Sequence, residues 1–160
     1  MKFIKNFFSF KILIILTIFI LDRISKIYVI NFFDQASFDE IYLLEFLNIY
    51  LIWNKGIAFG LMSFDNVTIY NIITLLIILI TLIVFYFSMK NKDITGYFFA
   101  MIFAGSLGNL FDRLKYSGVP DFIDFHIGNY HWFIFNVADI AISLGVICLI
   151  LVELFYNKKL

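Results

Sequence analysis

Four long apolar stretches constrain the fold of this chain more than any other feature. They cover residues 12–30, 67–89, 94–112 and 132–153. An α-helix rises 1.5 Å per residue, so about 20 apolar residues cross the ~30 Å hydrocarbon core of a bilayer. Hydrophobic residues make up 62% of the chain and charged residues only 15%, which excludes a soluble domain, a disordered chain and a nucleic-acid-binding protein. We expect one integral membrane domain over residues 1–160 with four transmembrane helices.

The distribution of lysines predicts the orientation of these helices. Basic residues cluster before the first stretch, between the second and third, and after the fourth: Lys2, Lys5, Lys11, Lys90, Lys92, Lys158 and Lys159. Loops rich in Lys and Arg lie on the cytoplasmic side of multi-pass proteins. We therefore expect both termini in the cytoplasm and the segments 31–66 and 115–131 outside.

The outward segment 31–66 is too long for a plain connection between two helices. Its run IYLLEFLNIYLIW (41–53) is typical of one or two short strands. Gly56 and Gly60 follow and indicate tight turns of the backbone. The predicted fold is therefore an all-α membrane protein with a small outward-facing β-rich element between the first two helices. We expect 115–131 to be a loop.

Polar residues gather at the outer ends of the third and fourth helices. Asn109, Asp112 and Arg113 end the third helix, and Asn136 and Asp139 lie on the fourth. A helix starting at residue 132 would carry Asp139 about 10 Å inward. A charged Asp at the centre of a membrane helix costs about 2.5–3.5 kcal/mol, so it needs a compensating role. A structural ion pair between Asp139 and Arg113 is one interpretation.

A second carboxylate beside Asp139 would give the site a chemical role. Two like charges that lie close together share one proton, so the pair offers a base for activating water and an acid for the scissile carbonyl. Asp121 and Asp124 in the following loop are the candidate partners. Pro120 restricts the backbone before Asp121 and favours it. This pattern indicates peptide hydrolysis without a metal ion or a nucleophilic serine.

Other catalytic chemistries have weaker support in the sequence. His126 and His131 are five residues apart in an expected loop and lack a convincing third ligand, so we expect no metal site and no cofactor. Ser106 lacks the partners of a catalytic triad, although pairing with Lys26 or Lys115 stays open.

A small transporter or channel is the alternative function, with intramembrane acids relaying protons or cations. The acids gather at one side of the membrane instead of lining a path, and the cytoplasmic half of the helices holds only Glu153 near its edge. A membrane hydrolase is therefore favoured.

Five sequence blocks resemble, in order and spacing, the motif regions of the bacterial lipoprotein signal peptidases, also called signal peptidase II. The resemblance covers essentially the whole chain. The blocks are LDRISK (21–26), NKGIAFG (54–60), AGSLGNLFDRL (104–114), VPDFIDF (119–125) and FNVADIAISLG (135–145).

The resemblance implies an aspartic endopeptidase of the bacterial cytoplasmic (inner) membrane, with its active site toward the outer face. Such an enzyme removes the signal peptide of prolipoproteins by cutting before the diacylglyceryl-modified cysteine. The expected partners are this substrate, membrane lipids and the inhibitor globomycin, with no nucleic acid. The motif positions assign catalysis to Asp121 and Asp139 and substrate binding or support of the site to Asn54, Asn109, Asp112, Arg113, Asn136 and Asp22.

Three positions depart from the family pattern. Arg23 replaces a Gln, Ile57 replaces an Ala, and Phe133 stands where a Pro usually follows Trp132. These departures concern substrate contact and entry into the fourth helix, and none of them touches the expected aspartate pair.

Overall fold

The computed structural model describes residues 2–36, 40–56, 67–128 and 130–156. Its elements follow in the order α1 (Lys2–Gln35), β1 (Ile41–Leu44), β2 (Leu47–Asn54), α2 (Val67–Lys90), α3 (Thr95–Tyr116), β3 (Val119–Ile127), β4 (Tyr130–Phe135) and α4 (Val137–Tyr156).

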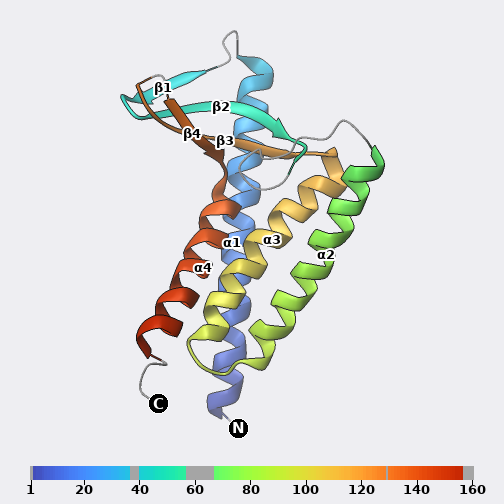
Figure 1. Ribbon diagram of the computed structural model, residues 1–160, viewed down its shortest axis with the longest axis vertical. Coiled ribbons are helices and arrows are strands. Elements are labelled where there is room, and N and C mark those ends of the chain that lie inside the picture. Colours follow the sequence, from blue (N-terminus) through green and yellow to red (C-terminus); the bar gives the residue numbers. More distant parts are fainter. Residues whose placement is uncertain (1, 37–39, 57–66, 129, 157–160) are drawn as a thin grey trace.

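The helices form a bundle with the sheet at one end (Figure 1). α3 contacts each of the other three helices, and α1 also contacts α4. The N-terminus, the C-terminus and the connection from α2 to α3 lie at the opposite end from the sheet (Figure 1). The start of α1, with Lys2, Lys5 and Lys11, and the connection with Lys90 and Lys92 therefore share one end of the molecule.

The surface of α2 is apolar and its buried face is polar, the reverse of a helix in a soluble protein. Its buried residues are Thr74, Thr81 and Ser88, at seven-residue spacing. The Thr74 and Thr81 hydroxyls donate to backbone carbonyls four residues earlier, at 2.9 and 2.7 Å. Leucine and isoleucine side chains point outward. Small polar residues inside and aliphatic residues outside are typical of helices surrounded by lipid.

Within the described part of the chain, two helices are long and apolar enough to cross a membrane by composition alone. They are α2, with a mean hydropathy of 2.8, and residues Val137–Phe155 of α4, with 2.4. α1 has 34 residues and α3 has 22, or about 51 and 33 Å of helix. Both carry charged residues that are buried inside the bundle.

Small residues on α3 allow neighbouring helices to approach closely, as the spacing of Ala100, Ala104 and Gly108 predicts. Ala100 and Ala104 are completely buried. A Cβ atom added at Gly108 would lie 2.6 Å from Oδ2 of Asp22 on α1. Glycine at this position therefore admits a carboxylate between α1 and α3.

The sheet is antiparallel in the order β1-β2-β3-β4. β1 and β2 fall in the segment 31–66, where the sequence predicts strands. The expectation of a loop over 115–131 is wrong, because β3 and β4 form a hairpin there and β3 pairs with β2. Buried aspartates on β3 interrupt the apolar alternation by which a strand is normally identified.

The helix boundaries also differ from expectation. α1 and α3 extend beyond the apolar stretches, because charged residues that pair inside the bundle do not end a helix. α4 begins at Val137, five residues after the expected start at Trp132. Asp139 therefore lies in the first turn of α4 and not about 10 Å along it.

Candidate active site

Asp121 lies on β3 and is 97% buried, where β3 approaches the helix ends. Its Oδ1 accepts a hydrogen bond from Nδ2 of Asn136 at 2.6 Å, and its Oδ2 accepts one from Nδ2 of Asn54 at 2.9 Å. Asn54 ends β2, in the segment paired with Val119 of β3. Both carboxylate oxygens are thus held by amides from neighbouring elements.

Asp139 and Asn136 form a reciprocal cap at the start of α4. The Asn136 side-chain oxygen accepts from the backbone N–H of Asp139 at 3.1 Å, and Oδ2 of Asp139 accepts from the backbone N–H of Asn136 at 3.1 Å. This is the geometry of a capping box, in which the N-cap residue and the third helical residue satisfy each other's amides. The cap explains why α4 begins at Val137.

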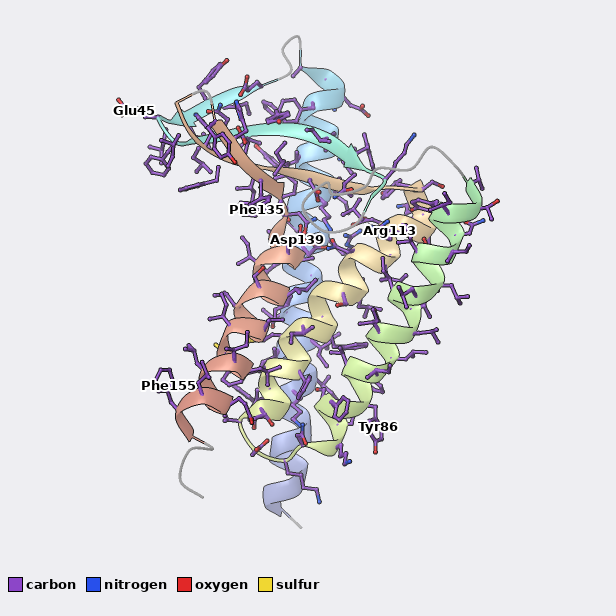
Figure 2. All side chains as sticks on the ribbon, in the orientation of Figure 1. Glu45, Tyr86, Arg113, Phe135, Asp139 and Phe155 are labelled. Atoms are coloured by element: carbon purple, nitrogen blue, oxygen red, sulfur yellow. The ribbon has the colours of Figure 1, made fainter. Side chains whose placement is uncertain are left out.

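Asn136 connects the two aspartates through different atoms. Its Oδ1 caps the helix at Asp139, which fixes the orientation of its amide, and its Nδ2 donates to Asp121. Asp121 and Asp139 line one cavity of about 170 Å³, together with Asn54, Ser106, Asn109, Arg113 and apolar side chains from α2, β3 and α4. Figure 2 places Asp139 and Arg113 at the end of the bundle next to the sheet.

The environment of Asp121 raises its pKa from 3.8 to about 7. Burial is the largest cause, and the negative charge of Asp139 adds to it. Hydrogen bonds from Asn54 and Asn136 and the positive charge of Lys26 act in the opposite direction. Near neutral pH Asp121 is therefore divided between its protonated and ionised forms, as a group that both gives and takes a proton requires.

A buried ion network lies on α1 and α3 beside the cavity. Lys26 contacts Asp22 Oδ1 at 2.9 Å and Asp112 Oδ2 at 2.7 Å, and the Arg23 guanidinium pairs with both acids. Asp22 also accepts from the backbone N–H of Ala138 in the first turn of α4 at 3.0 Å. The network thereby joins α1, α3 and α4.

A chain of hydrogen bonds links this network to Asp139. Nζ of Lys26 donates to Oδ1 of Asn109 at 2.7 Å, and Nδ2 of the same Asn109 donates to Oδ1 of Asp139 at 2.8 Å. Because the ammonium occupies the amide oxygen, the amide nitrogen must face the carboxylate. Lys26 thus orients the Asn109 amide so that its Nδ2 faces the carboxylate of Asp139.

Arg113 and Asn54 hold the chain directly after β2. The Arg113 guanidinium donates to the Gly56 carbonyl, and the Gly56 backbone N–H donates to Oδ1 of Asn54 at 2.8 Å. Among the described residues, no hydrogen-bond partner reaches Nη1 of Arg113. This buried donor belongs to a residue that lines the cavity and can bind a carbonyl oxygen there.

The structure brings most of the sequence-predicted residues together in this cavity. Asn54, Asn109, Arg113, Asp121 and Asp139 line it, and Asn136 bonds both aspartates. A second set of residues supports the site through the ion network: Asp22 and Asp112.

Several alternatives from the sequence are decided by these contacts. Arg113 donates to Gly56, and Asp139 is bonded to Asn109 and Asn136, so the structural pair between Asp139 and Arg113 is not the arrangement observed. Lys26 is occupied by the ion network and not by Ser106.

Asp124 does not line the cavity with Asp121. Its Oδ2 is 2.8 Å from the imidazole Nδ1 of His131 on the β3–β4 hairpin, where the carboxylate accepts a hydrogen bond from the ring N–H. The separate environment of Asp124 follows from β3 being a strand, because side chains three residues apart on a strand point to opposite faces.

Sequence reasoning missed the role of Arg23 and Lys26. Their signal was present, since both follow Asp22 within four residues of an otherwise apolar stretch, but the sequence alone does not show that Asp112 of α3 pairs with them. Of the positions that depart from the family pattern, Phe133 lies on β4 and not at the entry of α4. Ile57 and Gly60 lie outside the described residues.

The arrangement can perform acid–base catalysis on a bond brought into the cavity. Two carboxylates face the same space, amides orient both of them, and the pKa of one lies near neutrality. A paired base and acid of this kind is what water attack on an amide requires.

The chain is similar to known proteins in sequence and in structure. Residues 14–155 match the family described as Signal peptidase (SPase) II. The chain is 53% identical over 156 residues to a lipoprotein signal peptidase of Pelagibacter ubique, covering 98% of this chain and 93% of that protein. It is 35% identical to a lipoprotein signal peptidase of Anaplasma marginale, covering 92% and 86%.

A solved structure of a bacterial membrane enzyme is also similar, with a TM-score of 0.74 and 34% identity over 94% of this chain and 92% of that one. The sequence similarities and the similar fold agree with one another. The chain therefore belongs to the signal peptidase II family.

Proposed function

We propose that this protein removes the signal peptide of diacylglyceryl-modified prolipoproteins by cutting before the lipidated cysteine, with Asp121 and Asp139 as the catalytic pair. One observation carries this proposal: the two carboxylates line a single cavity and are joined through Asn136. The substrate class follows from the family, whose similar members are lipoprotein signal peptidases.

The proposed reaction uses one water molecule and one shared proton. Ionised Asp139, with its oxygens accepting from Asn109 and the Asn136 backbone, takes a proton from the water, and the water oxygen attacks the scissile carbonyl carbon. Protonated Asp121 gives its proton to the carbonyl oxygen. The tetrahedral intermediate then returns that proton to Asp121 as the C–N bond breaks, and the leaving amine takes the proton held by Asp139.

The other cavity residues have proposed roles in positioning. Nη1 of Arg113 binds a substrate carbonyl, because it is a buried donor without a partner among the described residues. Asn54 and Asn136 orient Asp121, and Asn109 orients Asp139. Asp22 and Asp112 act through Lys26, whose ammonium holds Asn109 in place.

The surroundings of the site suit a substrate that arrives from the membrane. We propose that all four helices cross the bilayer, with both termini in the cytoplasm and the sheet at the outer face. The apolar lining from Ile77, Ile80 and Ile142 reaches the aspartates from α2 and α4, so that a lipid-modified segment can enter between helices. Membrane lipids and globomycin-type inhibitors are the further partners that this proposal includes.

The direct test is cleavage of a purified diacylglyceryl-modified prolipoprotein by the purified protein in detergent. We expect Asp121→Asn and Asp139→Asn each to reduce turnover to near background, and the double variant to lose little more, because residues that act as one unit are not additive. The matched control is Asp34→Asn, which changes an exposed carboxylate near the end of α1.

Asp124→Asn separates the two acids of β3. Because Asp124 bonds to His131 and does not line the cavity, we expect this variant to keep measurable activity. Full activity of Asp121→Asn, together with a folded but inactive Asp124→Asn variant, would refute the assignment of Asp121.

A further inference from the structure

A second group of chemically active side chains lies on the β3–β4 hairpin and takes no part in the proposed reaction. Asp124, His126 and His131 each place one ligand atom within 4.8 Å of the others. The His131 Nδ1 is 2.8 Å from Oδ2 of Asp124, and the His126 Nδ1 is 3.4 Å from the same oxygen. Both imidazoles therefore direct the same type of nitrogen toward one carboxylate.

A register shift in the hairpin brings the two histidines together. Asp124 pairs with Ile134 and Phe125 with Phe133, but His126 then pairs with His131, so that β4 has one more residue than β3 at this point. Without this bulge, residue 132 would lie opposite His126, and His131 would point to the other face of the sheet. The imidazole rings instead stack with centroids 5.2 Å apart.

Asp124 and His126 are buried, and the cluster lacks a full set of partners. Asp124 is 0% and His126 8% exposed. In the part of the chain that the structure describes, Oδ1 of Asp124 and Nδ1 of His126 have no hydrogen-bond partner, and no Lys or Arg forms an ion pair with Asp124. A buried carboxylate without a cation is costly, so this site is suited to a positive charge from outside the chain.

We propose that Asp124, His126 and His131 bind a divalent transition-metal ion such as Zn²⁺. Ligand atoms around a tetrahedral Zn²⁺ with bonds of 2.0–2.2 Å lie roughly 3.4 Å apart, close to the 3.4 and 2.8 Å observed here without an ion. Two imidazoles and a carboxylate are a common ligand set for such metals. The His131 side chain is 48% exposed, which leaves a coordination position for water.

The ion would fasten the hairpin and not take part in hydrolysis. Successive side chains of a strand point to opposite faces, so Asp124 and Asp121, three residues apart on β3, lie on opposite sides of the sheet. From Phe122 to Ile127 the burial pattern follows this alternation, because Phe122, Asp124 and His126 are buried and the residues that follow each of them are more exposed. Metal binding would therefore stabilise the strand that carries Asp121 without reaching the cavity.

The chain contains two histidines, which allows a direct test. Protein labelled with ¹⁵N-histidine, purified without a histidine tag, is titrated with Zn²⁺ at pH 7.5 while the imidazole nitrogens are followed by NMR. We expect both imidazoles to shift together and saturate at one ion per chain. No shift, or a shift of His131 alone, would refute the site and leave two stacked histidines, with His131 hydrogen-bonded to Asp124.

Variants provide a second measurement. We expect His126→Gln and Asp124→Asn each to weaken Zn²⁺ binding by calorimetry about tenfold or more, while Asp34→Asn leaves it unchanged. Zn²⁺ should raise the unfolding temperature of the unmodified protein and not that of His126→Gln. Prolipoprotein cleavage should persist after chelation. Equal affinity in His126→Gln would overturn the site, and cleavage that requires Zn²⁺ would overturn its non-catalytic role.

Discussion

The raised pKa of Asp121 predicts that this residue destabilises the folded protein as the pH rises. The folded pKa is about 7 and the ordinary value is 3.8. Folding therefore favours the protonated form, and the contribution of Asp121 to stability is complete below about pH 4 and is lost progressively as the pH rises to about 7. One pKa unit corresponds to about 1.4 kcal/mol, so the whole change is on the order of 4 kcal/mol.

Asp121→Asn removes the titration and keeps the shape of the side chain. An amide has one donor end, and both neighbours of Asp121 are Nδ2 donors whose orientation is held by the Gly56 and Asp139 backbone. The N–H₂ group of the new amide would therefore face the Nδ2 donor of Asn54 or of Asn136, at a cost of about 1–3 kcal/mol at every pH. We expect the variant to be less stable than the unmodified protein at pH 4.5 and more stable at pH 8.

The assay is reversible unfolding in mixed micelles at several pH values. The difference in free energy of unfolding between the two proteins isolates the titration of Asp121, because the other groups are common to both. This difference should change by several kcal/mol across the range, whatever the constant cost of the amide. A pH-independent difference, or an unmodified protein that gains stability relative to the variant as the pH rises, would refute the reasoning.

Two further predictions concern contacts in and beside the site, and a third concerns the membrane topology. Asn136→Ala removes the cap of α4, worth about 0.5–2 kcal/mol, and a hydrogen bond that lowers the pKa of Asp121. Because protonated Asp121 is the proposed acid, the alkaline limb of the cleavage profile should move to higher pH. Asn136→Ser should recover stability but not the profile, and an unmoved alkaline limb in both variants would contradict this. Gly108→Ala places a Cβ 2.6 Å from Oδ2 of Asp22 and should destabilise the folded protein by about 1–3 kcal/mol. The control Gly118→Ala has its nearest contact at 3.6 Å and should be neutral in thermal unfolding. Equal effects of the two substitutions would show that the close approach of α1 and α3 is unimportant. Cys148 is the single cysteine of the chain, so a Cys148→Ser background is free of other thiols. In this background, an impermeant thiol reagent outside intact cells should label a cysteine at position 34 and not one at position 92, and the reverse pattern would overturn the proposed topology.

The sequence by itself predicted the membrane class, the helical stretches, strands in 41–53 and the family. These features depend on local composition and periodicity, which are visible without knowledge of which segments meet. The five motif blocks also indicated most of the residues that line the cavity. Family membership and the membrane character are confirmed by the structural and sequence similarities.

The ends of the helices were less predictable, because hydropathy alone does not define them. Lys26 and Arg23 interrupt an apolar stretch, yet α1 continues through them since Asp22 and Asp112 pair with both inside the bundle. The start of α4 depends on the cap between Asn136 and Asp139.

Only the tertiary structure decided how the acids of 119–139 are divided. β3 and β4 join the sheet by pairing with residues far away in sequence, such as Asn54 with Val119, and strand alternation then directs Asp121 and Asp124 to opposite faces. A single bulge places His131 opposite His126. Spacing along the chain reveals neither the partner strand nor its register. The position of Asp121 at the cavity and of Asp124 beside two histidines could therefore be recognised only in the folded protein.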